Sequence, residues 1–114
     1  MMRMHVVAAL VAAWGSLAAS ASALSVAECF EGSDFIANAA LARENGMSRA
    51  EFLGRLEDDL ELIHAYPPQL RWFAKDRADE VFLYDSARQV FDQPLAPDQH
   101  RARFLAACLD RGMG

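Results

Sequence analysis

The sequence contains no threonine and few other β-branched residues, which gives the first indication of its fold class. After residue 23 the only ones are Val26, Ile36, Ile63, Val81 and Val90. Such residues are enriched in strands, and no long stretch alternates apolar and polar side chains as a half-buried strand would. We therefore predict an all-α protein of four or five helices, arranged as a compact bundle or an orthogonal array.

The chain also lacks the usual residue sets of enzymes. Among the histidines, only His64 and His100 lie after residue 23, and no serine lies in a glycine-flanked elbow. A serine nucleophile with an oriented base is therefore not indicated. The glycines are isolated and no Cys-x-x-Cys-His motif occurs, which argues against a phosphate-binding loop and attached haem. We expect no enzymatic activity and no cofactor.

The first 23 residues have the pattern of a secretory signal peptide. Arg3 precedes an apolar, alanine-rich run over residues 6–19, and small residues then permit cleavage after Ala21 or Ala23. The alternative is a membrane anchor, but an apolar run of about 14 residues is shorter than the roughly 17–25 that span a bilayer. We predict a signal peptide over residues 1–23 and a single helical domain over residues 24–114.

The expected mature chain is acidic. The full sequence of 114 residues has 11 basic and 16 acidic residues, and loss of Arg3 with the signal changes the net charge from −5 to −6. An acidic surface disfavours nucleic acid and anionic lipid headgroups, which attract basic patches. We therefore expect a periplasmic or secreted protein that has no nucleic-acid partner and no stable membrane insertion after cleavage.

The two cysteines, Cys29 and Cys108, enclose almost all of the expected mature chain. In an exported protein such a pair most simply forms a disulfide, here between the first helix and the last. A closed loop of about 80 residues would contribute roughly 4–5 kcal/mol through chain entropy. The alternatives are two buried thiols or a redox pair, although redox cysteines are usually close in sequence.

Apolar spacing and capping signals predict where the first two helical regions begin and end. The first begins near Ser25 and ends at Gly46, and residues 31–34 leave open whether it is one helix or two. Ser48 and Glu51 have the spacing of a capping box. The helix that follows carries its apolar residues at helical spacing until residues 66–68, where two prolines end it.

Three further helices are predicted beyond these prolines. A short helix over residues 69–75 would place Leu70 and Phe73 inward. A helix over residues 81–91 has Phe82 outside its main apolar stripe, which predicts burial on two sides. The last helix begins at Pro97 and is expected to end at Gly112. Its predicted inward face consists of Phe104, Leu105, Cys108 and Leu109.

One set of residues has metal-ligating chemistry. Glu57, Glu61 and His64 lie at i, i+4 and i+7, so they share one helix flank and could hold a divalent ion. Bundle proteins that bind metals through carboxylates use Glu-x-x-His on two helices, and only one copy occurs here. We therefore interpret the flank as solvated and assign no metal, while a small-ligand or metal carrier remains the alternative function.

Residues 66–73 form the most distinctive segment, with two prolines and three aromatic residues. Tryptophan and arginine are enriched at interface hot spots. The segment is therefore a possible interaction surface, unless its aromatic residues only cap the core at a tight corner. The residues assigned to this surface are Tyr66, Pro67, Pro68, Arg71 and Trp72.

The chain resembles small exported two-cysteine helical proteins of Proteobacteria that have no assigned activity. The resemblance rests on the alanine-rich signal, Cys29, residues 45–48, the proline pair at 67–68 and residues 104–108. It implies residence in the periplasm and transfers no catalytic residue. We expect an interaction or accessory factor, such as an inhibitor, an immunity-type binder or a chaperone-like protein, whose partner is another periplasmic protein.

Overall fold

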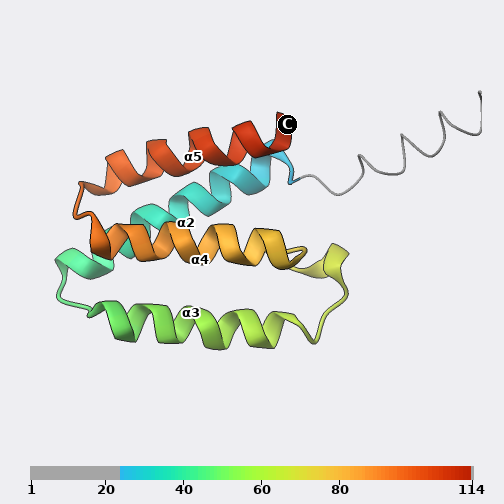
Figure 1. Ribbon diagram of the computed structural model, residues 1–114, viewed down its shortest axis with the longest axis horizontal. Coiled ribbons are helices and arrows are strands. Elements are labelled where there is room, and N and C mark those ends of the chain that lie inside the picture. Colours follow the sequence, from blue (N-terminus) through green and yellow to red (C-terminus); the bar gives the residue numbers. More distant parts are fainter. Residues whose placement is uncertain (1–23, 114) are drawn as a thin grey trace, which may run out of the picture.

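The computed structural model describes residues 24–113, so the expected signal peptide lies outside the described part of the chain. Four α-helices and one short 3₁₀-helix make up this part, which contains no strand, and consecutive α-helices run antiparallel (Figure 1). The predicted all-helical fold class is confirmed. The elements are α2 (Val26–Glu44), α3 (Arg49–Ile63), the 3₁₀-helix η1 (Pro68–Leu70), α4 (Arg77–Asp92) and α5 (Pro97–Met113).

Helix α2 is continuous, which answers the question left open around residues 31–34. It begins with a complete capping box, because the Ser25 hydroxyl accepts from the Glu28 N–H and the Glu28 carboxylate accepts from the Ser25 N–H, both at 3.1 Å. Ser33 does not cap a second helix. Its hydroxyl instead donates to the carbonyl oxygen of Phe30 at 2.7 Å and is buried within α2.

The turn between α2 and α3 follows the predicted signals in part. Gly46 has a φ of 96°, the left-handed conformation that ends many helices. The Ser48 hydroxyl caps α3 by accepting from the Glu51 N–H at 3.1 Å. The reciprocal half of the predicted capping box is not formed, since the Glu51 carboxylate lies 3.5 Å from the Arg55 guanidinium instead.

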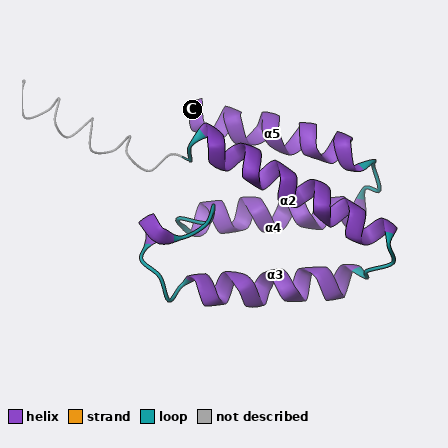
Figure 2. Ribbon diagram, turned by 180° about the vertical axis from the view of Figure 1, so that it is seen from behind, coloured by secondary structure: helices purple, strands orange, loops and turns teal. Residues whose placement is uncertain are grey.

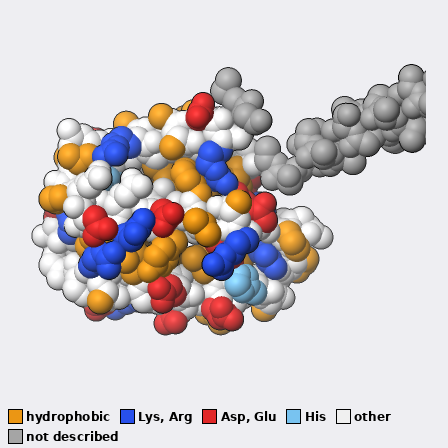
Figure 3. All heavy atoms as spheres, viewed as in Figure 1, with side chains coloured by type: hydrophobic (Ala, Val, Ile, Leu, Met, Phe, Trp, Pro, Cys, Tyr) orange, Lys and Arg blue, Asp and Glu red, His pale blue; other side chains and the backbone are white. Residues whose placement is uncertain are grey.

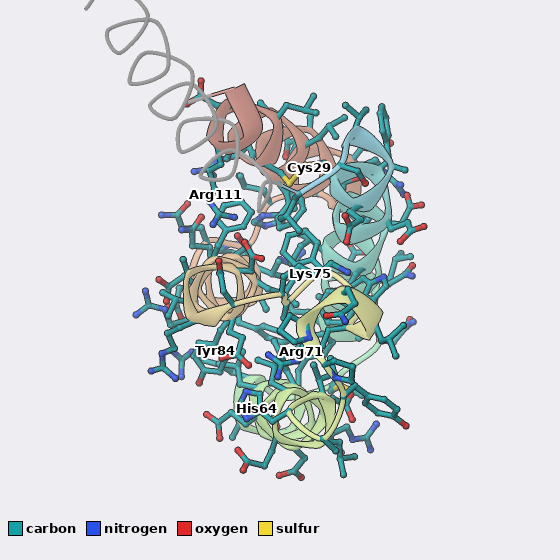
Figure 4. The ribbon with its side chains drawn as sticks, turned by 90° about the vertical axis from the view of Figure 1, so that its right-hand side faces the viewer. Cys29, His64, Arg71, Lys75, Tyr84 and Arg111 are labelled. Carbon is teal, nitrogen blue, oxygen red and sulfur yellow. A yellow bond between two sulfur atoms is a disulfide. The ribbon has the colours of Figure 1, made fainter. Side chains whose placement is uncertain are left out.

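Helices α2 and α5 form the closest pair in the fold. The predicted disulfide between Cys29 and Cys108 is confirmed, with the two Cα atoms 5.6 Å apart (Figure 4). Figure 2 shows α2 running obliquely between α5 and α4. Its buried face consists mainly of small residues, which lets the backbones approach closely. They are Cys29, Gly32, Ser33, Ile36, Ala37, Ala39 and Ala40.

Three phenylalanine rings fill the space beside this pair. Phe73 is fully buried, and its ring centroid lies 5.6 Å from that of Phe104, which in turn stacks 5.0 Å from Phe82. A Cβ at Gly32 would come within 2.8 Å of the Phe73 and Phe104 rings, so the absence of a side chain there admits the cluster. Helix α4 contacts both α2 and α3, which confirms that it is buried on two sides.

The predicted short helix over residues 69–75 is wrong beyond its first turn. Only η1 forms, and Leu70 is 69 % exposed rather than inward. The backbone becomes extended at Arg71, and Phe73 takes a φ of 55° with the Ala74 N–H 2.5 Å from the Trp72 carbonyl oxygen. A continued helix would not bring Phe73 into the aromatic cluster, so burial of its ring overrides the local helical preference.

The predicted end of the last helix is also wrong, because α5 continues through Gly112 to Met113. Glycine permits a left-handed residue but does not require one. The last turn is instead held by Arg111, whose guanidinium lies 4.3 Å from the centre of the Phe82 ring and 3.2 Å from the Asp79 carboxylate. Asp79 is buried, and this burial raises the pKa of its carboxyl group.

Side chains from α2 and α5 fix the link between α4 and α5. Arg43 donates from its guanidinium to the carbonyl oxygens of Val90 at 2.5 Å and Leu95 at 2.7 Å. The buried His100 ring donates from Nε2 to the carbonyl oxygen of Gln93 at 2.9 Å. Burial lowers the pKa of His100, because the charged imidazolium is less well solvated there. The folded link between α4 and α5 therefore contains His100 as a neutral ring.

Candidate interaction site

An apolar groove lies between α2 and α3. The two helices meet at the Gly46 turn and then diverge, as Figures 1 and 2 both show, and η1 lies between them at the open end (Figure 4). The groove has a volume of about 450 Å³. Its lining is apolar with one exception, Asp59, and consists of Phe35, Leu56, Asp59, Leu60, Leu62, Ile63, Trp72 and Leu83.

Trp72 forms one wall of the groove. Its ring lies edge-on to Phe35, with the centroids 5.6 Å apart, and remains 39 % exposed. Phe35 also contacts Phe52 of α3, with 5.8 Å between centroids. The turn at Phe73 sends that ring into the core while its neighbour Trp72 stays at the groove. The structure thus gives these two adjacent aromatic residues different surroundings.

Two basic side chains hold the segment between α3 and α4, residues 64–76, which we call the corner. Arg71 donates from Nε to the carbonyl oxygen of Tyr66 at 2.8 Å, which folds its side chain back along the corner. Lys75 forms an ion pair with Glu28 of α2 at 3.1 Å and donates to the carbonyl oxygen of Arg71. Arg71, predicted as part of an interaction surface, is therefore engaged within the corner.

The other predicted surface residues lie at the outside of the corner. Tyr66 is 58 % exposed, and Pro67 and Pro68 are also exposed. Apolar side chains are visible at the right-hand end of Figure 3, over η1. Two exposed leucines that the prediction missed, Leu62 and Leu70, lie on α3 and η1. The exposure of Leu62 could have been predicted from the sequence, since Leu62 is an apolar residue outside the buried stripe of α3.

The outer face of α3 is acidic. Residues 57–61 contain four acidic side chains and no basic one. Acidic atoms accordingly gather along the lower edge of the molecule in Figure 3, where α3 lies. No residue within 24–113 forms an ion pair with Asp58 or Asp59. The groove is thus bordered on the α3 side by uncompensated negative charge.

The residues considered for metal binding face a different hollow, of about 370 Å³ between α3 and α4. Glu57, Glu61 and His64 line it together with Glu80, whose carboxylate forms a short hydrogen bond with His64 Nε2. The Glu57 carboxylate accepts from the Tyr84 hydroxyl at 2.9 Å, which raises the pKa of Tyr84. Among the residues that the structure describes, no three carboxylate, histidine or cysteine side chains are arranged to hold a metal ion.

Comparisons with models of protein families, with curated proteins and with solved structures find no match to this chain. Within residues 24–113, no helix combines the length and apolar character that crossing a membrane requires. The groove, the corner and the charge around them are therefore the features that indicate a function.

Proposed function

We propose that this is an exported helical interaction protein that binds another periplasmic or secreted protein through the groove between α2 and α3. The proposal covers an accessory subunit, an inhibitor or immunity-type binder, or a chaperone-like factor. The observation that carries it is the open apolar groove beside Trp72, with Leu62 exposed in its lining and Tyr66 and Leu70 exposed on the neighbouring corner. Exposed apolar surface of this kind, bordered by polar residues, is typical of interaction sites.

The signal-like first 23 residues and the disulfide support an extracytoplasmic location. Disulfides persist in oxidising compartments and are rare in the cytosol. The bond between Cys29 and Cys108 is compatible with such a location. In a small domain it also fixes α2 against α5 without a large core, so the face of α2 that carries Phe35 can remain open.

The arrangement of the histidines favours binding over catalysis. His64 is paired with Glu80, and the His100 ring donates to a backbone carbonyl within the α4–α5 link. Neither of these rings lies in hydrogen-bonding contact with a serine or another nucleophile. A general base beside a nucleophile is the minimum for covalent catalysis, so we do not propose an enzyme.

A small-ligand carrier is the second candidate. The groove volume of about 450 Å³ falls within the roughly 300–1,000 Å³ of small-molecule pockets. A carrier would hold its ligand against Trp72 and Leu83 and would need no protein partner. Retention of a compound during gentle purification, detected as extra mass of a few hundred daltons, would favour this candidate.

Site-specific photo-cross-linking in the host organism tests the proposed function. A photoreactive phenylalanine analogue replaces Leu70, which is exposed on η1 at the open end of the groove. As a matched control it replaces Leu41, which is exposed on α2 and does not line the groove. We expect a discrete adduct with a second protein from position 70 and none from position 41. Absence of any adduct from positions 62, 66 and 70 would contradict a protein-binding role for this surface.

A further inference from the structure

We infer that the segment bound by the groove is an amphipathic helix whose apolar stripe is flanked by basic residues. This inference rests on the proposed function and specifies the kind of partner. It follows from two independent properties of the site, the shape of the groove and the charge along its border.

The shape of the groove suits a helix. Leu56, Leu60 and Ile63 lie at i, i+4 and i+7 on α3, so they form an apolar ridge about 10 Å long along the helix axis. Phe35 of α2 and Trp72 of the corner form the opposite wall. A helix laid between two helices inserts side chains at the same i, i+3/i+4 and i+7 spacing, which is the usual helix-in-groove mode of recognition.

The acidic border of the groove favours basic residues on either side of the apolar stripe of that helix. Asp59 lines the groove, Asp58 is its exposed neighbour, and no described residue forms an ion pair with either. Two basic residues of the corner do not pair with these carboxylates, since Arg71 donates to the carbonyl oxygen of Tyr66 and Lys75 pairs with Glu28. Lysine or arginine beside the partner's apolar stripe would therefore meet uncompensated carboxylates, which favours association and its rate.

The same charge argues against a second copy of this chain as the occupant. In a symmetric dimer through the groove, the same patch meets itself. Such a dimer would bring the acidic segment 57–61 of one α3 close to that of the other, and like charges placed together oppose association.

Trp72 makes the inference directly measurable. The chain contains two tryptophans, Trp14 and Trp72, so the mature protein expected after signal cleavage reports from the groove alone. The probes are two tryptophan-free helical peptides with the same leucine stripe, one with lysine and the other with glutamate at every polar position. We expect the Leu/Lys peptide to change the Trp72 emission and to bind at least about tenfold more tightly than the Leu/Glu peptide.

Three variants locate the binding. Leu62→Lys places a cation at the groove and should weaken binding of the Leu/Lys peptide about tenfold or more. Leu41→Lys adds the same charge elsewhere on α2 and should leave the affinity within about twofold of the parent. Asp59→Asn removes one border charge and should weaken binding about two- to fivefold.

The outcomes separate this inference from the proposed function. Equal binding of both peptides, or equal loss of affinity in Leu62→Lys and Leu41→Lys, would overturn the inference and leave the protein-binding role in place. The same holds if neither peptide binds but position 70 cross-links to a partner in the host. If neither peptide binds and positions 62, 66 and 70 give no adduct, both the inference and the proposed function fail.

Discussion

Helix α2 packs against α5 along one face and faces α3 across the groove with another, and it meets these two helices in different ways. Toward α5 it presents small residues and the Cys29–Cys108 disulfide, so that interface is closed. Toward α3 it presents Phe35, whose ring contacts Phe52 and lines the groove. One face of this helix thus carries small residues in a closed interface, and another carries a large aromatic residue beside a groove that is open to a partner.

The α5 side and the α3 side also differ in the contacts that hold them. Helix α3 contacts α4, and His64 forms a hydrogen bond with the buried Glu80 of α4. Exposed or half-exposed side chains form the other ties, the Arg49–Asp92 ion pair and the Tyr84–Glu57 hydrogen bond. Such surface contacts each contribute little, typically about 0–1 kcal/mol. We therefore expect α3 to be the adjustable wall of the groove and the α2–α5 pair to be its rigid base.

The largest expected effect comes from removing the disulfide. Cys29→Ser and Cys108→Ser should each lower the free energy of unfolding by about 4–5 kcal/mol, because the bond closes a loop with a sequence separation of 79. The two variants should be equivalent, since each breaks the same bond. Urea unfolding followed by circular dichroism measures the loss. A double serine variant as stable as the parent would show that the scaffold does not depend on its disulfide.

A matched pair of glycine substitutions contrasts the two sides. Gly32→Ala on α2 would place a Cβ 2.7 Å from the Phe104 ring, and such overpacking typically costs about 1–3 kcal/mol. Gly54→Ala on α3 meets no atom within 4 Å, and alanine is favoured over glycine in a helix by up to about 1 kcal/mol. We expect opposite shifts in thermal stability, measured by calorimetry. Shifts of the same sign would contradict the difference in packing.

Lowering the pH should destabilise the link between α4 and α5 through protonation of His100. Its pKa is lowered in the folded protein, so below the ordinary value of about 6.5 the unfolded chain binds more protons than the folded one. Stability should therefore fall as the pH drops below that value and stay level above it. In His100→Asn the dependence just below about pH 6.5 should largely disappear. An unchanged pH profile of unfolding would exclude His100 as its source.

The smallest expected effect concerns the hydrogen bond between Tyr84 of α4 and Glu57 of α3. The Glu57 carboxylate raises the pKa of Tyr84 above its ordinary 10.0 by accepting the phenolic proton in a hydrogen bond. Glu57→Gln should bring this pKa back toward the ordinary value, as measured by ultraviolet titration of the tyrosines. Asp58→Asn is the control, because it removes a charge from α3 that forms no bond to Tyr84. Equal effects of the two variants would indicate that α3 does not dock on α4 in this way.

Local signals in the sequence predicted the parts of the fold that local chemistry decides. The Ser48 cap, the stop at Gly46 and the proline break after α3 depend on residues close in sequence, and all three are confirmed. The disulfide was predictable because the sequence contains only two cysteines and an apparent export signal. The continuity of α2 through Gly32 was not, because packing against Phe73 and Phe104 decides it.

The candidate site could be predicted only in part. The composition of residues 66–73 directed attention to the corner, and Trp72 does lie at the groove. The positive φ at Phe73 and the internal role of Arg71 depend on contacts that form only when α2, α3 and α4 are in place. The groove itself comes from the divergence of α2 and α3, for which a single helix pattern contains no signal.

Amide hydrogen exchange, measured on the oxidised protein alone and with the Leu/Lys peptide, distinguishes the rigid base of the groove from its adjustable wall. We expect α3 and the corner to exchange faster than α2 and α5, because they are held by fewer buried contacts. The peptide should then slow exchange in α3 and the corner and leave α5 unchanged. Uniform exchange along all four helices, or peptide protection confined to α5, would contradict the division into a rigid scaffold and an open binding wall.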